Sequence, residues 1–275
     1  MKSILVNLAA HNGTDVAGDY AISLAAAFDA HILGVAFAYV PGLRRSPLHT
    51  TAAGMLEEQR RASEKAAQAA ASRFDAAARR AALSAASRIM TTTLPGAPDL
   101  FGPLARRFDM SVVAQAEPNK IAPEELIIEA ALFGSGRPAL IVPYIHKDGL
   151  KLDRVLLCWD GGRAAARAFG DAMPLLRRAT AVDVVAVTTE PPKSDEIAGA
   201  DVAEMLARHG LAVALRRIGA DGIGVANTIL NHAADTGANL IVMGGYGHSR
   251  LREFVLGGTT REMLAAMTVP TLMSH

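Results

Sequence analysis

The most informative part of the chain runs from Leu240 to Ala266 and reads Leu-Ile-Val-Met-Gly-Gly-Tyr-Gly-His-Ser-Arg-Leu-Arg-Glu-Phe-Val-Leu-Gly-Gly-Thr-Thr-Arg-Glu-Met-Leu-Ala-Ala. An apolar run, Leu240 to Met243, predicts a buried strand that stops at Gly244. A glycine loop continues to Gly247, and a second glycine pair, Gly257 and Gly258, opens a helix-like stretch. This order favours phosphate binding, because the loop N–H groups are unobstructed and the helix dipole attracts an anion.

The glycines also have a simpler interpretation. A glycine pair beside a helix is often only a cap and a turn, with no ligand. Five glycines at these offsets after a buried strand are more than one turn requires. The stretch fits neither the dinucleotide fingerprint nor the Walker pattern, so a conventional kinase or P-loop ATPase is not expected.

The spacing of the glycines points to one family. Two residues separate Gly244 from Gly247, and nine separate Gly247 from Gly257. This resembles the nucleotide-binding signature of the universal stress protein family, in which the last glycine precedes Ser or Thr. Gly258 stands at that position, so a side-chain donor is lost while the backbone N–H remains. Thr259 or Thr260 could supply a substitute hydroxyl, although neither is in register.

Composition narrows the class of protein. The 275 residues suit one large or two ordinary domains. The net charge of +1 gives no case for nucleic-acid binding by bulk electrostatics. Cys158 is the single cysteine, which excludes an intramolecular disulfide and a cysteine-rich zinc site. No apolar run reaches bilayer length, and the N-terminal run is broken at Asn7, so we expect a cytoplasmic protein.

The predicted elements occur twice in the same order. The paired segments are the first strands Ile4–Leu8 and Val155–Trp159, the helices 14–29 and 162–179, the second strands Ile32–Phe37 and Val182–Val187, and the last strands Pro138–Val142 and Val269–Met273. Apolar strands that alternate with helices predict parallel sheets covered on both faces. We therefore expect an α/β protein with two flavodoxin/Rossmann-like doubly wound domains, residues 1–147 and 152–275.

The two halves differ in two respects. Residues 52–87 are rich in Ala and Arg and predict one long helix with a solvated, charge-paired face. After the predicted strand Met110–Ala114 the first half has no glycine loop, and Pro118 offers no N–H to a phosphate. We therefore expect the first half to be a degenerate copy without a nucleotide site of this kind.

The resemblance covers essentially the whole chain and has the tandem, two-domain form. It implies a five-stranded parallel sheet in each domain, with strand order 3-2-1-4-5, and ATP as ligand with or without Mg²⁺. It also implies that the last strands of the two domains pair as in a pseudo-dimer, which would cover the edges near Pro138–Val142 and Val269–Met273. A further homodimer is left open.

Residue by residue, the resemblance implies a ligand site in the second half. Asp160 would lie by the nucleoside, where the first half has Ala9, although Asp160 could instead only shape the Asp-Gly-Gly turn. The backbone of Val187 would meet the adenine edge, and Met243 would form an apolar wall. The residues implied around the phosphates are Gly244, Gly247, His248, Gly257, Gly258 and Thr259. Arg250 and Arg252 could help to neutralise phosphate or could simply be solvated.

The sequence offers little catalytic chemistry. It has no His pair spaced for metal chelation and no Gly-x-Ser-x-Gly nucleophile elbow, so we expect no metal site and no catalytic residues. Cys158 and Trp159 could line the pocket or pack beneath a helix. Our main hypothesis is an ATP-binding stress-response protein that acts through nucleotide-dependent conformation or partner binding. The alternatives are an interaction module that never binds nucleotide, and a slow ATPase with His248 as its base.

Overall fold

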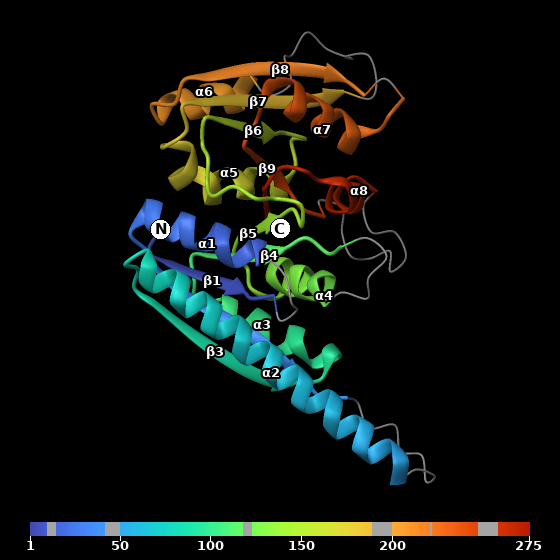
Figure 1. Cartoon of the computed structure of the whole chain (residues 1–275). Coiled ribbons are helices and arrows are strands. Elements are labelled where there is room, and N and C mark those ends of the chain that lie inside the picture. Colours follow the sequence, from blue (N-terminus) through green and yellow to red (C-terminus); the bar gives the residue numbers. More distant parts are fainter. Residues whose placement is uncertain (10–14, 42–49, 118–122, 189–199, 221, 247–257) are drawn as a thin grey trace.

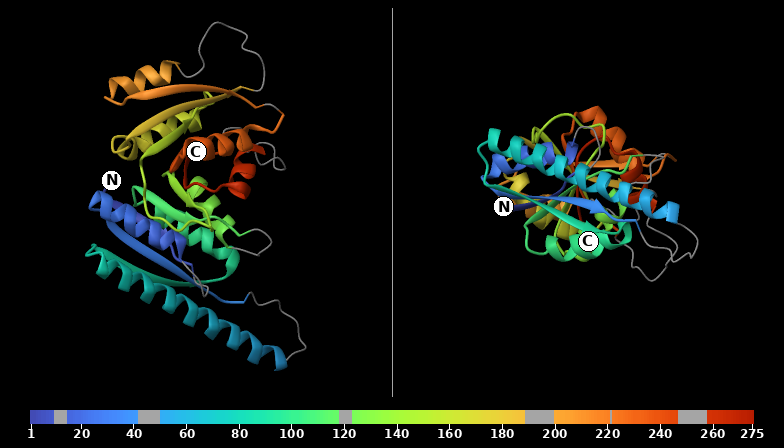
Figure 2. Two further views of the ribbon diagram at one scale, coloured as in Figure 1. Left: turned by 45° about the horizontal axis from the view of Figure 1, so that its top comes forward. Right: turned by 60° about the horizontal axis from the view of Figure 1, so that its bottom comes forward.

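A computed structural model describes residues 1–9, 15–41, 50–117, 123–188, 200–220, 222–246 and 258–275. One twisted sheet of ten strands runs through the molecule, and helices cover both of its faces (Figures 1 and 2). The strand order is β3-β2-β1-β4-β5-β10-β9-β6-β7-β8, so the halves meet in the middle of the sheet.

The N-terminal half contributes five strands and the helices around them. Its elements are β1 (Ser3–Asn7), α1 (Val16–Phe28), β2 (His31–Tyr39), α2 (Thr50–Arg80), β3 (Ala85–Thr92), the 3₁₀ turn η1 (Leu94–Gly96), α3 (Ala97–Ala105), β4 (Met110–Ala114), α4 (Glu124–Glu129), the π-helical turn η2 (Ala130–Gly134) and β5 (Ala139–Val142).

The C-terminal half repeats this plan. Its elements are β6 (Arg154–Cys158), α5 (Arg163–Leu176), β7 (Ala181–Thr188), α6 (Ala200–Arg208), β8 (Val213–Gly219), α7 (Val225–Thr236), β9 (Leu240–Gly244), α8 (Gly258–Ala266) and β10 (Thr271–Ser274). Within each half all pairings are parallel and the order is 3-2-1-4-5, which confirms the predicted fold class.

The two halves join through their last strands. β5 and β10 pair antiparallel, with Leu140 opposite Leu272 at the centre of the pair. The expected pairing of these edges is therefore present, and it removes two edges that would otherwise be open. Because the sheet is continuous, the division into domains 1–147 and 152–275 stays a prediction.

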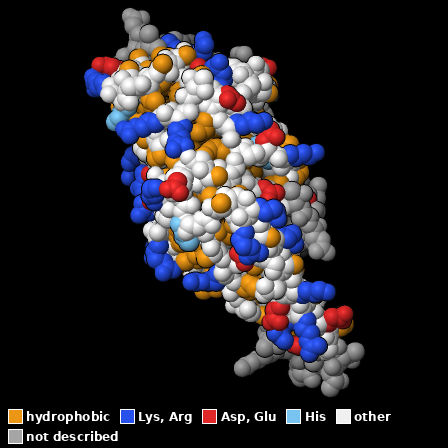
Figure 3. Space-filling model, turned by 60° about the vertical axis from the view of Figure 1, so that its left-hand side comes forward, with side chains coloured by type: hydrophobic (Ala, Val, Ile, Leu, Met, Phe, Trp, Pro, Cys, Tyr) orange, Lys and Arg blue, Asp and Glu red, His pale blue; other side chains and the backbone are white. Residues whose placement is uncertain are grey.

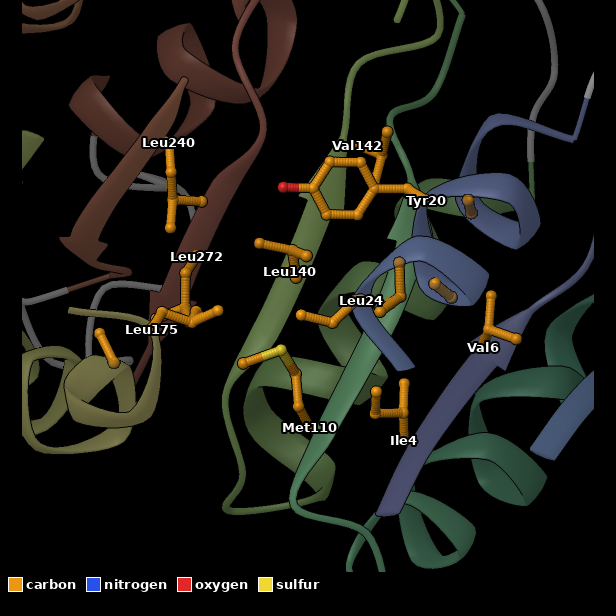
Figure 4. Close-up of a cluster of buried hydrophobic side chains, with 14 of the residues drawn as sticks. Ile4, Val6, Tyr20, Leu24, Met110, Leu140, Val142, Leu175, Leu240 and Leu272 are labelled. Carbon is orange, nitrogen blue, oxygen red and sulfur yellow. The ribbon is translucent and has the colours of Figure 1, made fainter. Parts of the chain in front are cut away.

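The core is also continuous across the seam. One apolar layer lies under α1, α2, α5 and α6 and contains side chains of both halves. In Figure 4, Tyr20 and Leu24 of α1 lie on the same face of the sheet as Leu140 and Leu272, which stand on either side of the seam. The layer on the opposite face, under α3, α4, α7 and α8, likewise spans both halves. Because burial of apolar surface is the main stabilising term in folding, the two halves stabilise each other.

The long helical segment is shorter than the sequence predicted. α2 ends at Arg80, Ala82 has a left-handed backbone (φ 53°), and β3 begins at Ala85, so the prediction of one helix over 52–87 was wrong at its end. The segment after the turn pairs along the whole length of β2. Tertiary strand pairing overrides the helix preference of its alanines.

The start of α2 extends beyond the sheet (Figure 1). Tyr39, the last residue of β2, donates its N–H to the Ser63 hydroxyl, 2.6 Å away, and the helix residues before Ser63 continue past this strand end. Arg60 pairs with Glu57 and Glu64 on this part of the helix. Red and blue side chains gather there in Figure 3. The expected solvated face with charge pairs is therefore present.

Candidate nucleotide site

A pocket of about 400 Å³ lies at the carboxyl ends of β6, β7 and β9. This is the sheet edge at which open α/β folds place their ligands. Its lining residues are Cys158, Trp159, Asp160, Val185, Val187, Val225, Ile229, Met243, Gly244, Tyr246, Gly258, Thr259 and Thr260.

The pocket brings together six of the nine predicted site residues. They are Asp160, Val187, Met243, Gly244, Gly258 and Thr259. The other three, Gly247, His248 and Gly257, lie outside the described residues, as do Arg250 and Arg252. That these residues bind a nucleotide remains a prediction.

One wall of the pocket is apolar. Val185, Met243 and Ile229 are buried, and they come from β7, β9 and α7 respectively. Val187 lies half-buried at the end of β7. Such a surface suits a flat, weakly polar ring, because ligand pockets are mostly apolar with a few polar groups that fix orientation.

Asp160 lies at the exposed rim of the pocket. Its Oδ1 accepts a hydrogen bond from the Gly162 N–H, 2.8 Å away, at the start of α5. Gly162 is the N-cap of this helix and has no side chain to cap it. Asp160 therefore shapes this turn, as the simpler interpretation proposed. Its carboxylate retains a second oxygen that can accept a hydrogen bond from a ligand.

Gly244 has a packing role that the sequence did not reveal. A Cβ at this position would lie 2.5 Å from the backbone nitrogen of Ala165 and 2.7 Å from the backbone carbon of Ala164. The first turn of α5 therefore crosses the end of β9 so closely that only glycine fits there. At Gly258, in contrast, the nearest atom to a Cβ among the described residues is Glu262 Oε1 at 3.7 Å, an ordinary contact distance.

The two threonines that could replace the missing hydroxyl have different environments. Thr260 is buried, and its Oγ1 accepts a hydrogen bond from the Tyr246 N–H at 3.0 Å. Thr259 lies half-buried in the pocket lining. Because the Thr260 hydroxyl is already engaged with Tyr246, Thr259 is the better placed of the two to contact a ligand.

Cys158 and Trp159 point to opposite faces of the sheet. Burial raises the pKa of the Cys158 thiol to about 12, so the thiol stays protonated at neutral pH. A protonated, buried thiol is a poor nucleophile. The Trp159 ring packs against Phe169 of α5, with centroids 5.0 Å apart. Both side chains therefore serve packing, while some of their atoms also line the pocket.

The equivalent place in the N-terminal half carries different side chains. The pairing registers match β1 with β6 and β2 with β7, so Phe37 corresponds to Val187 and Ala9 to Asp160. Phe37 is buried and stacks on Tyr39, with centroids 6.0 Å apart. The helix after β4, α4, begins with a buried carboxylate, Glu124. An aromatic ring at this position leaves less room for a base. A carboxylate at the start of the helix repels a phosphate.

Sequence reasoning missed Val185, Val225, Ile229 and Tyr246 as pocket residues. Val225 and Ile229 are four residues apart on α7 and share one face of that helix. This spacing is visible in the sequence, but only the tertiary structure shows that the face lies over the end of β7.

Two further features are absent from the described residues. Within them, no group of three or more His, Cys, Asp or Glu side chains is arranged to hold a metal ion. Likewise, no helix that the structure describes has both the length and the apolarity needed to cross a membrane.

The fold and this pocket define a doubly wound α/β protein with a ligand-type cavity at the carboxyl edge of its C-terminal half. Residues 151–275 match the universal stress protein family. This segment belongs to that family, and the match supports a role in stress response. No curated protein matches the chain.

Solved structures share the fold over nearly the full length. A universal stress protein from Archaeoglobus fulgidus is 16% identical with a TM-score of 0.66, and the match covers 98% of this chain and 94% of that one. A functionally unknown protein from Pseudomonas aeruginosa is 14% identical with a TM-score of 0.59, covering 98% and 91% of the two chains. The N-terminal half therefore shares the architecture of these proteins.

Proposed function

We propose that the C-terminal half binds ATP in the pocket at the ends of β6, β7 and β9. The protein would act in the stress response through nucleotide-dependent conformation or partner binding. The observation that carries this proposal is the pocket itself, which joins an apolar wall to the N-terminus of α8 within the segment that matches the family.

The described residues fit the three parts of the nucleotide. Val187, Ile229 and Met243 offer an apolar surface for the base. The Asp160 carboxylate would accept a hydrogen bond from a ribose hydroxyl. The first N–H groups of α8, beginning at Gly258, have no partner within the helix and favour an anion. Gly247, His248 and Gly257 would complete the phosphate site, and Mg²⁺ would accompany the phosphates.

This function needs no catalytic residue. Slow hydrolysis is the second activity that the sequence allows, with His248 as the base. ATP turnover that disappears in His248→Ala would support it. We also propose that the protein is cytoplasmic and has protein partners that respond to the nucleotide state.

Thr259 provides the test. Wild-type protein at an ATP concentration a hundredfold above Kd should gain about 2.7 kcal/mol of stability in thermal unfolding. Thr259→Glu brings a carboxylate to the start of α8, as in α4 of the N-terminal half, and should weaken ATP binding at least tenfold by charge repulsion. Thr259→Gln is the neutral control of similar size and should bind far more tightly than Thr259→Glu.

The stability of the ligand-free variants separates repulsion from misfolding. A carboxylate in the first turn of a helix is stabilising, so Thr259→Glu without ligand should unfold at or above the wild-type temperature. If wild-type protein is not stabilised by any adenine nucleotide at millimolar concentration, the proposal fails. A nucleotide-independent interaction module would then be the better description.

A further inference from the structure

A side chain of the N-terminal half contacts the edge of the pocket. Phe133, in the π-helical turn η2, packs on Tyr246 with ring centroids 4.8 Å apart. The Phe133 ring also packs against the ring of His275, 4.9 Å away, and His275 Nδ1 lies 3.2 Å from the Gly245 carbonyl oxygen. The chain segment just after β9 is therefore enclosed by aromatic groups from two distant parts of the sequence.

Tyr246 itself has an unusual backbone. Its φ is +53°, in the left-handed region that non-glycine residues rarely adopt. The other two such residues in the described part of the chain, Asp29 and Ala82, lie within two residues of the carboxyl end of a helix, where this conformation is common. Tyr246 follows a strand instead, and surrounding contacts must hold it. Those shown are the hydrogen bond from its N–H to Thr260 Oγ1 and its packing on Phe133.

A second contact from the N-terminal half holds helix α8. Gln115, which follows β4, is buried, and its Nε2 donates to the Leu264 carbonyl oxygen at 2.8 Å. Its Oε1 accepts from the Tyr144 N–H at 3.3 Å, so the amide is fixed at both ends. Leu264 lies in α8, the helix whose first residues line the pocket.

We propose that Phe133 and Gln115 are positioning residues for the pocket of the C-terminal half. Phe133 holds Tyr246 in its strained conformation, and Gln115 holds α8, so two walls of the pocket depend on the N-terminal half. The half that carries Phe37 and Glu124 at the equivalent positions thus completes the site of the other. For the identity of the ligand this inference rests on the proposed function.

The arrangement couples the ligand to the contact between the halves. If Phe133 and Gln115 strengthen ligand binding by a given factor, ligand binding must strengthen their contacts by the same factor. A partner that recognises η2 or the end of β4 would therefore sense whether the pocket is occupied.

Phe133→Ala tests the proposal. The interaction free energy of an aromatic pair corresponds to a roughly three- to tenfold change in affinity. The Kd for ATP should therefore rise by that factor. Phe133→Tyr retains the ring and should bind ATP nearly as the wild type does. Trp159, the only tryptophan, lines the pocket and provides a fluorescence signal for the titration.

The control is a contact between the halves far from the pocket. The Arg178 guanidinium lies 4.2 Å from the Phe28 ring centroid, and it donates to the Ala27 carbonyl oxygen. Ala27 and Phe28 end α1, and Arg178 follows the end of α5 by two residues. Both helix ends lie at the amino ends of the strands, opposite the pocket. Arg178→Gln should leave the Kd for ATP unchanged. An equal Kd in wild type and Phe133→Ala, or an equal loss in Arg178→Gln, would overturn the proposal.

Amide hydrogen exchange separates this inference from the proposed function. In ligand-free Phe133→Ala the Tyr246 N–H should exchange faster than in the wild type, while in Arg178→Gln it should not. If wild-type protein binds no ATP, the proposed function fails but this comparison still decides the positioning role. Unchanged exchange at Tyr246 in Phe133→Ala would show that Phe133 does not hold the pocket edge.

Discussion

The two halves of this protein have the same five-stranded plan, but they carry different side chains at the carboxyl edge of the sheet. In the C-terminal half, Val187 and Thr259 border an open pocket, and α8 begins with a glycine. In the N-terminal half, Phe37 occupies the position of Val187, and α4 begins with Glu124. The comparison teaches that a few side chains at strand ends and helix starts determine whether this fold has room for a ligand.

The halves also differ at the end of the fourth strand of each sheet. Ala114 of β4 occupies the position that Gly244 holds in β9. The N-terminal half tolerates a Cβ there, whereas in the C-terminal half the backbone of α5 lies in the way. Gly244→Ala should therefore lower the free energy of unfolding by about 3 kcal/mol, because backbone atoms must shift.

Gly245→Ala is the matched control for this prediction in a denaturant titration. The nearest atom to a Cβ at Gly245 is Met273 Cβ at 3.6 Å, an ordinary contact distance. This variant should cost far less than Gly244→Ala. Equal stabilities of the two variants would show that the crossing of α5 over β9 is not tight.

A buried ion pair is a second difference between the halves. Arg154 and Asp183 pair at 2.6 Å in the C-terminal half, with the Asp183 side chain 2% exposed. The register places Ser3 and Leu33 at these positions in the N-terminal half. Arg154→Ala leaves a buried carboxylate without its cation and should cost about 2 kcal/mol of stability, less than a fully buried pair because Arg154 is partly exposed.

Copying the N-terminal half should reverse this loss. The double variant Arg154→Ser with Asp183→Leu replaces the pair by the residues found in the other half and should recover most of the stability of the wild type. A double-mutant cycle measured by urea unfolding gives the coupling energy directly. A double variant less stable than Arg154→Ala would mean that the pair is needed for packing on β7.

The pocket itself can be given the corresponding side chain of the N-terminal half. Val187→Phe places the ring of the N-terminal half in the open pocket and should weaken ATP binding at least tenfold, about 1.4 kcal/mol, with little change in stability. Val187→Ile keeps an aliphatic side chain and should bind ATP nearly as well as the wild type. Isothermal titration calorimetry checks both, and unchanged affinity in Val187→Phe would place the ligand elsewhere.

The smallest expected effect concerns the start of the first helix of each half. Asp15 caps α1 by accepting from the Gly18 N–H at 2.9 Å, whereas the cap of α5, Gly162, makes no side-chain bond. Burial raises the pKa of Asp15 to about 6. The folded state therefore binds more protons than the unfolded state between the two pKa values, and the contribution of Asp15 to stability falls as the pH rises through this range.

Asp15→Asn keeps a capping oxygen and removes the titration. The stability difference between variant and wild type should shift in favour of the variant by about 1 kcal/mol between about pH 4 and pH 7, less than the full change in pKa would give because the Asp15 side chain is only half-buried. Thermal unfolding of both proteins across this range measures the stability difference. The pH dependence that comes from the other carboxylates is the same in both proteins and cancels in the difference. A difference that does not change with pH would mean that Asp15 is well solvated in the folded state.

Local pattern in the sequence determined the elements, the fold class and part of the site. The apolar strands, the alternation with helices and the repeated order fix the doubly wound plan, because side-chain period and burial follow directly from residue order. The glycine spacing and Asp160 located the carboxyl edge of the C-terminal half, where the pocket lies.

Only the tertiary structure decided what depends on distant contacts. The sequence could not show that α2 ends at Arg80, because pairing with β2 converts the following residues to a strand. It could not show that Gly244 is required by the backbone of α5, or that Phe133 packs on Tyr246 across 113 positions of the chain. Such contacts are set by how strands and helices pack, and residue order alone does not encode them in any local pattern.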